Sequence, residues 1–195
     1  QESWDDALFY YIRSMLNSKD NIDLKFKMAQ IFINSNYTDK AILTLNEILD
    51  IDPYYLDAYV KLGEIYLSVL DYENAKISFT EYLLLNPNNR DGYYLLGLSY
   101  IGLNKYNFAL DAFKKTILID HLYADAHYYI AIINESIFKY DLAIIHYKKA
   151  KQYGTEFEDL NFRYGTLLYT MERYQDAMNP LKDYFFIDPE NIDLL

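Results

Sequence analysis

Alanine recurs at a constant interval of 34 residues along the whole chain. The six positions are Ala7, Ala41, Ala75, Ala109, Ala143 and Ala177. A single globular domain has no reason to repeat one small residue at a fixed spacing, whereas a stack of similar supersecondary units does. The interval therefore predicts an array of repeats that share one continuous core.

Large and small residues keep the same period around each alanine. Large apolar residues stand four positions after it, at Tyr11, Leu45, Phe79, Phe113, Tyr147 and Leu181. Small residues stand twelve positions before the last five alanines, at Ala29, Gly63, Gly97, Ala131 and Gly165. Positions three or four apart share one face of a helix. We therefore expect two helices in each repeat, which approach closely at the small residues.

The chain has only 6 Gly and 4 Pro, which favours long helices joined by short turns and an all-α fold. The first helices of the repeats are expected at about 23–36, 57–69, 91–103, 125–137 and 159–171. The second helices are expected at about 5–17, 39–51, 73–85, 107–119, 141–153 and 175–187. Pro53, Pro87 and Pro189 should end three of the second helices. Where Thr155 replaces this proline, Thr155-x-x-Glu158 fits a capping box.

A family motif is visible in the second complete repeat. Its residues are Tyr59, Leu62, Gly63, Tyr66, Ala75, Phe79 and Pro87, in the spacing Tyr-x-x-Leu-Gly-x-x-Tyr, then Ala-x-x-x-Phe, then Pro. This pattern resembles the tetratricopeptide repeat, with one aromatic residue exchanged at the first position. The resemblance implies a right-handed α-solenoid of helix-turn-helix units.

The same register divides the chain into repeats of one continuous domain, 1–195. Residues 1–21 are expected to be the second helix of a partial repeat, and 192–195 the start of a further helix. The complete repeats are expected at 22–55, 56–89, 90–123, 124–157 and 158–191. Because both ends look incomplete, the chain is interpreted as a piece of a longer protein or as one whose ends a partner covers.

Several classes of chemistry find no support in the sequence. A net charge of −11 disfavours nucleic-acid backbones and anionic membranes, and the lack of cysteine excludes disulfides and zinc-thiolate sites. The histidines His121, His127 and His146 fall at three different places in the repeat and form no metal motif. We identify no catalytic constellation, cofactor motif or metal site, so the sequence does not indicate an enzyme.

A row of aspartates also follows the repeat. It consists of Asp23, Asp57, Asp91, Asp125, Asp159 and Asp193. Acidic residues in the first turn complement the positive end of a helix, and neighbouring copies would lie too far apart to share one ion. We interpret the row as a helix-start feature and not as a cation site.

The resemblance places a binding surface on the first helix of each repeat. In the family these helices line a concave groove, with the second, fifth, sixth, ninth, twelfth and thirteenth residues of each repeat facing the ligand. The matching apolar and aromatic residues here are Phe26, Val60, Tyr94, Leu98, Ile101, Tyr128, Ile132, Phe162 and Tyr169. About half of such residues are expected to pack into the core instead of facing a ligand.

The predicted function is a protein-protein interaction scaffold that binds a peptide or helix of a partner in this groove. The cationic clamp with which some family members hold a terminal carboxylate is missing, and carboxylates near the wall favour an apolar ligand with basic flanks. The alternatives are a regulatory or targeting domain of a larger, possibly enzymatic protein, and a self-association module that uses the uncapped ends. No apolar run could insert in a membrane, and both cytoplasm and periplasm are compatible with the sequence.

The alanine series predicts the cost of overpacking. Ala109→Leu, in the middle of the array, should lower the free energy of unfolding by about 1–3 kcal/mol, because a larger side chain cannot fit between the two helices. Ala7→Leu, in the partial repeat, should cost less. Chemical denaturation of both variants tests this, and equal losses would show that the register is misread.

Overall fold

A computed structural model of the chain describes residues 21–187. The chain divides into an N-terminal unit, Gln1–Lys105, and a C-terminal unit, Tyr106–Leu195. The helices of the N-terminal unit are α2 (Ile22–Asn34), α3 (Thr38–Ile51), α4 (Leu56–Ser68), α5 (Tyr72–Leu85) and α6 (Arg90–Gly102). Those of the C-terminal unit are α7 (Tyr106–Ile119), α8 (Ala124–Ser136), α9 (Tyr140–Tyr153), α10 (Leu160–Thr170) and α11 (Tyr174–Ile187). The helix expected at 5–17, Ala7, Pro189 and residues 192–195 lie outside the described residues.

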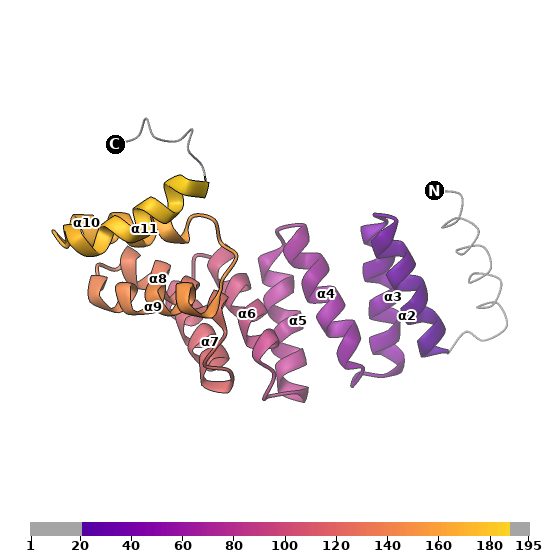
Figure 1. Cartoon of the computed structure of the whole chain (residues 1–195). Helices are drawn as coiled ribbons and strands as arrows, with labels where there is room; N and C mark the ends of the chain where they lie inside the picture. The colour runs from indigo at the N-terminus through magenta and orange to yellow at the C-terminus, as the bar shows by residue number, and fades with distance from the viewer. Residues whose placement is uncertain (1–20, 188–195) are drawn as a thin grey trace. The chain divides into compact units, whose positions relative to one another are not determined.

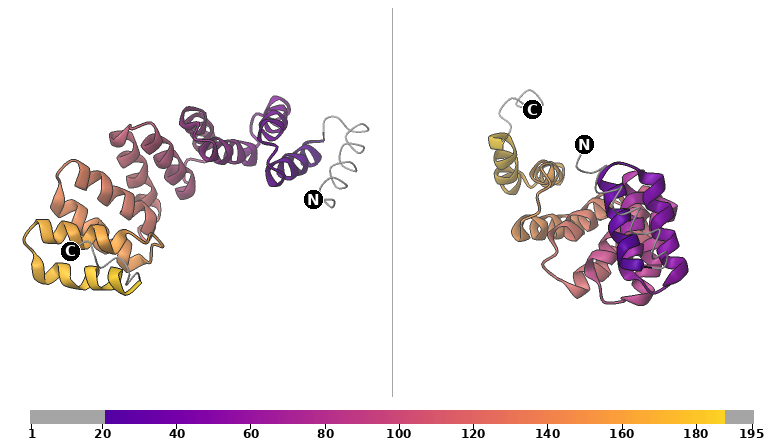
Figure 2. Two further views of the ribbon diagram at one scale, coloured as in Figure 1. Left: turned by 90° about the horizontal axis from the view of Figure 1, so that it is seen from above. Right: turned by 90° about the vertical axis from the view of Figure 1, so that its right-hand side faces the viewer.

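Consecutive helices pack as antiparallel pairs within each unit (Figure 1). The pairs are α2 with α3, α4 with α5, α8 with α9, and α10 with α11; two further views show the last pair side by side (Figure 2). Each helix begins and ends within two residues of its expected bounds. The predicted all-α class of helix-turn-helix units is therefore confirmed in the described residues.

The helices of a pair meet where the sequence places small residues. Ala41, Ala75, Ala109 and Ala143 are fully buried, and Ala177 is 1% exposed. A Cβ atom built on Gly63 would lie 2.5 Å from the Phe79 ring, and one on Gly165 would lie 2.6 Å from Leu181 Cγ. These distances are below van der Waals contact, so no larger side chain fits without movement of the helices.

The aspartate row lies at helix starts, as expected. Asp23, Asp57, Asp91 and Asp125 occupy first turns, and Asp159 is the N-cap residue of α10. The capping box expected at Thr155 is wrong. The Thr155 hydroxyl donates to Asp125 Oδ1 over 2.5 Å, and α10 begins only at Leu160. The side chain therefore joins the end of repeat 124–157 to its beginning and caps no helix.

The turn inside each repeat contains a residue in the left-handed region. These residues are Asn36, Leu70, Asn104, Phe138 and Glu172, with φ between 57° and 62°. Asparagine tolerates this conformation, whereas a branched or bulky side chain is strained there. The residue types differ from repeat to repeat, which is why the sequence alone did not reveal this second series at the 34-residue period.

Two histidines join α8 to α9. His127 Nε2 lies 3.1 Å from the carbonyl oxygen of His121, which can only accept, so this nitrogen carries the proton. His127 Nδ1 is then the acceptor for His146 Nδ1–H, 2.8 Å away. Burial lowers the pKa of His127, and burial with the neighbouring His127, Lys149 and Lys114 lowers the pKa of His146 to about 4. Folding therefore favours the neutral pair.

The left-handed turn predicts a stabilising substitution. Leu70→Asn should raise the free energy of unfolding by about 1 kcal/mol, because Leu70 is 67% exposed and loses little packing while the backbone strain is relieved. The matched control is Val69→Asn, one residue earlier at φ −97°, which should give no gain. Thermal unfolding compares the two, and an equal effect of both would contradict the strain argument.

The histidine pair predicts a loss of stability in mild acid. A ring whose pKa is lower in the folded than in the unfolded chain contributes stability above the unfolded value near 6.5, and that contribution falls as the pH drops toward about 4. Between pH 7 and 5 the wild type should lose about 1 kcal/mol more than His146→Gln, after allowance for solvent screening of the half-buried ring. Urea denaturation at both pH values measures the difference. Parallel pH profiles would contradict the lowered pKa of His146.

Candidate functional site

A cleft of about 370 Å³ opens between α2 and α4 in the N-terminal unit. Its lining comes from the first helices of two successive repeats. The residues are Gln30, Ile33, Asn34, Lys61, Glu64, Ile65 and Ser68. Most of them occupy the sixth, ninth, twelfth or thirteenth position of a repeat. These are positions that the family resemblance assigned to the ligand-facing wall.

The cleft has an apolar floor and a polar rim. Ile65 is 7% exposed and Ile33 is half-buried, whereas Gln30 and Asn34 are exposed one helical turn apart on α2. Each of these amides can both donate and accept a hydrogen bond. The site can therefore hold an apolar side chain while it satisfies the polar groups of a backbone.

Charges at the rim are paired but remain accessible. Lys61 Nζ lies 2.7 Å from Glu64 Oε2, and the two side chains are 38% and 43% exposed. An ion pair this open to solvent contributes about 0–1 kcal/mol, so a ligand can replace either partner at low cost. The Ser68 hydroxyl donates to the Ile65 carbonyl oxygen over 2.7 Å and is already satisfied.

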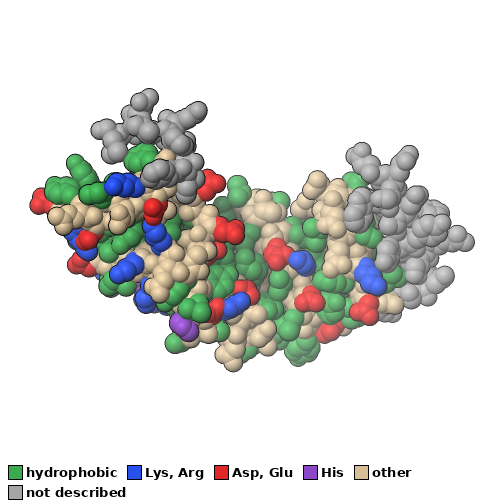
Figure 3. All heavy atoms as spheres, in the orientation of Figure 1, with side chains coloured by type: hydrophobic (Ala, Val, Ile, Leu, Met, Phe, Trp, Pro, Cys, Tyr) green, Lys and Arg blue, Asp and Glu red, His purple; other side chains and the backbone are tan. Residues whose placement is uncertain are grey.

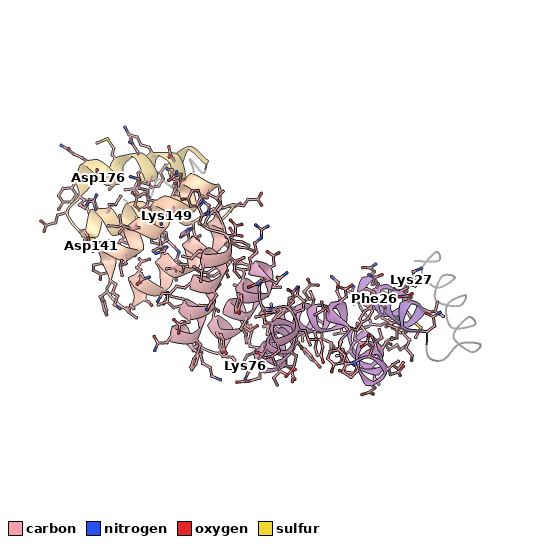
Figure 4. The ribbon with its side chains drawn as sticks, turned by 90° about the horizontal axis from the view of Figure 1, so that it is seen from below. Phe26, Lys27, Lys76, Asp141, Lys149 and Asp176 are labelled. Carbon is pink, nitrogen blue, oxygen red and sulfur yellow. The ribbon has the colours of Figure 1, made fainter. Side chains whose placement is uncertain are left out.

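The large residues named from the sequence do not line this cleft. In the N-terminal unit, Phe26, Val60, Tyr94, Leu98 and Ile101 are all half-buried. The Phe26 ring, labelled in Figure 4, packs edge-on against Tyr55 with centroids 5.4 Å apart. The sequence placed Gln30 at a ligand-facing position, but the residues expected to bind were the large apolar ones, and Asn34 was not among them. The spacing of four between Gln30 and Asn34 on an exposed helical face was the available signal.

Tyr128 lies in the core of the C-terminal unit. Its side chain is 5% exposed, stacks on Phe157 with centroids 4.2 Å apart, and donates to Asp159 Oδ1 over 2.5 Å. The expectation that it faces a ligand is corrected, because contacts with Phe157, Tyr129 and Tyr147 leave only 5% of the residue exposed.

The other named residues of this unit differ in exposure. Ile132 packs against the core, whereas Phe162 is 38% and Tyr169 is 60% exposed. Phe162 contacts Tyr184 with ring centroids 5.1 Å apart, and Tyr169 contacts Tyr174 at the same separation. Phe162 and Tyr169 therefore keep solvent-exposed surface that a ligand could contact, whereas Ile132 packs against the core.

Two carboxylates near the expected wall, Asp159 and Glu135, accept hydrogen bonds from other side chains of the chain. Arg163 Nε donates to Asp159, and the Tyr147 hydroxyl donates to Glu135. Burial alone would raise the pKa of Asp159, but the hydrogen bonds from Tyr128 and Arg163 outweigh it and lower that pKa. Burial, with the Glu135 contact, raises the pKa of Tyr147. The spacing of four between Asp159 and Arg163 is the sequence signal for this contact.

Between residues 21 and 187, no group of three or more His, Asp or Glu side chains is placed to hold a metal ion. No helix among the described residues has both the length and the apolar character needed to cross a bilayer.

Solved structures show the same fold at low sequence identity. MamA matches with a TM-score of 0.73 and 25% identity, over 77% of this chain and 88% of that one. YrrB, described as a TPR protein with an unusual peptide-binding site, matches with a TM-score of 0.76 and 18% identity, over 93% and 94%. PilF of Pseudomonas aeruginosa matches with a TM-score of 0.80 and 16% identity, over 98% and 87%. A search of curated proteins found no significant match.

A family model recognises the sequence itself. The model described as tetratricopeptide repeat matches residues 22–55 and 56–89. These two segments contain helices α2 to α5. The close contact between Gly63 and Phe79 follows from the spacing of small and large residues that is repeated along the chain. Residues 22–89 therefore carry two tetratricopeptide repeats, which confirms the sequence resemblance for this part of the chain, and the solved structures show the same fold over the described helices.

Proposed function

We propose that the chain is a binding scaffold that holds an extended peptide segment of another protein in the cleft between α2 and α4. Tetratricopeptide repeats form a protein-interaction fold. The observation that carries the proposal is the cleft itself, because it combines an apolar floor with two exposed amides at its rim.

The rim geometry favours an extended backbone. Gln30 and Asn34 lie one turn apart on α2, so their Cβ atoms are separated by about 5–6 Å, which is comparable with the ~6.6 Å between alternate residues of a strand. An extended ligand has unpaired N–H and C=O groups that both amides can satisfy. A helical ligand has already used its backbone groups internally, so it would gain less from this rim.

The floor and the charges define the ligand further. One medium-sized apolar side chain of the ligand would cover Ile33 and Ile65. A basic flanking residue would replace Lys61 as the partner of Glu64. The half-buried residues Phe26, Val60, Tyr94, Leu98 and Ile101 would extend the wall in the N-terminal unit. Ile132, Phe162 and Tyr169 would do so within the C-terminal unit, while Tyr128 would support it from the core.

The amide rim predicts a loss of peptide affinity. Peptides selected from a displayed random library against the wild-type chain should bind with dissociation constants on the order of micromolar. The Gln30→Ala, Asn34→Ala double variant should bind the same peptides at least about tenfold more weakly, because two or more hydrogen bonds of about 1 kcal/mol each are lost. Fluorescence polarisation measures the change.

The matched control removes the same two amide types from exposed positions in the other unit. Gln152 on α9 and Asn179 on α11 are both exposed, and their double alanine variant should leave the affinity unchanged. Circular dichroism checks that each variant keeps its helix content. Equal affinity of the Gln30, Asn34 variant and the wild type would refute the cleft as the binding site.

A further inference from the structure

The second helices of the C-terminal unit carry a series of lysines at the repeat period. Five residues after Ala109, Ala143 and Ala177 stand Lys114, Lys148 and Lys182. Six residues after the first two stand Lys115 and Lys149. With Lys151, these residues form what we call the lysine face, and all of them are exposed.

The matching positions of the N-terminal unit carry no basic residue. Asn46 and Thr80 stand five residues after their alanines, and Glu47 and Glu81 stand six residues after them. The series is therefore not a requirement of the fold, since the same helix position accepts amide, hydroxyl and carboxylate groups. Figure 3 shows Lys and Arg side chains gathered over the C-terminal unit and only scattered over the N-terminal one.

Lysines of α7 and α9 lie near the same residue, His146. Lys149, labelled in Figure 4, and Lys114 both lie close enough to His146 to help lower its pKa. Two carboxylates offset part of the charge: Asp111 lies 3.9 Å from Lys114, and Asp183 lies 2.5 Å from Lys151. Lys115, Lys148, Lys149 and Lys182 form no ion pair with any residue that the structure describes. A surplus of positive charge remains.

Exposed apolar residues alternate with these lysines. On α7, Leu118 is 76% exposed and follows Lys114 and Lys115 by one helical turn. On α9, Ile145 is 48% exposed and precedes Lys148 and Lys149 by one turn. Apolar and cationic groups at helical spacing form a surface that is complementary to an amphipathic segment with acidic residues beside its apolar stripe.

We propose that the lysine face docks an acidic polypeptide segment that carries leucine-like side chains at helical spacing. This surface is separate from the cleft, because it lies on second helices of the C-terminal unit. Nucleic acid is a poorer occupant, since its phosphates would leave Leu118 and Ile145 uncovered. A net charge of −11 also opposes the approach of an extended polyanion or an anionic membrane, whereas a short acidic segment is drawn to the local charge.

The test uses a fluorescein-labelled amphipathic peptide of about 18 residues, with leucines on one helical face and glutamates elsewhere. The full chain should bind it with a dissociation constant on the order of micromolar to tens of micromolar at low salt, and more weakly as salt is added. Lys115→Glu, Lys148→Glu should weaken binding at least about tenfold. The control variant Lys27→Glu, Lys40→Glu makes the same charge change in the N-terminal unit. It should change the dissociation constant of the peptide less than about twofold.

Three further binding measurements distinguish an acidic peptide from other ligands of the lysine face. The same peptide with lysine in place of each glutamate should not bind. A duplex DNA oligonucleotide and vesicles of phosphatidylserine with phosphatidylcholine should bind more weakly than the acidic peptide. The proposal is overturned if the acidic peptide fails to bind the wild type, if the Lys115, Lys148 variant binds as tightly, or if DNA or vesicles bind more tightly. Circular dichroism confirms that each variant is folded.

Discussion

Close contact between a small residue on one helix and a large one on its partner is the constraint on which this structure depends. Gly63 faces Phe79 and Gly165 faces Leu181 at distances that leave no room for a Cβ atom. The contact fixes the separation of the two helices, and its recurrence fixes the length of the repeat. The proposed binding surfaces can vary from repeat to repeat because this contact does not involve them. The rim amides and the lysine face occupy positions where the repeats differ in sequence.

The sequence predicted the helices well because their determinants are local. The spacing of small, large and proline residues sets the bounds of α4 and α5 without reference to distant residues. The turn residue at Leu70 escaped notice, since its conformation is imposed by two packed helices and not by its own type. The histidine pair also escaped notice, because His127 and His146 come together only when α8 packs on α9.

The candidate site was predicted in position better than in chemistry. The repeat register indicated which helix positions face the wall, and Gln30, Asn34, Glu64 and Ser68 occupy such positions. Aromatic residues were expected to dominate, but Tyr128 is covered by Phe157 and its hydroxyl is bound to Asp159. Size alone cannot distinguish a ring that faces a partner from one that faces the next repeat. That distinction depends on packing between helices far apart in sequence.

The repeating contacts build the scaffold, and we propose that the non-repeating wall between α2 and α4 binds the ligand. Mapping of backbone amide chemical shifts during titration with a library-selected peptide tests this claim most directly. The largest shifts are expected at Gln30, Asn34, Glu64 and Ser68, with little change along α3. Shifts confined to α3 and α5, or spread evenly over the chain, would contradict it.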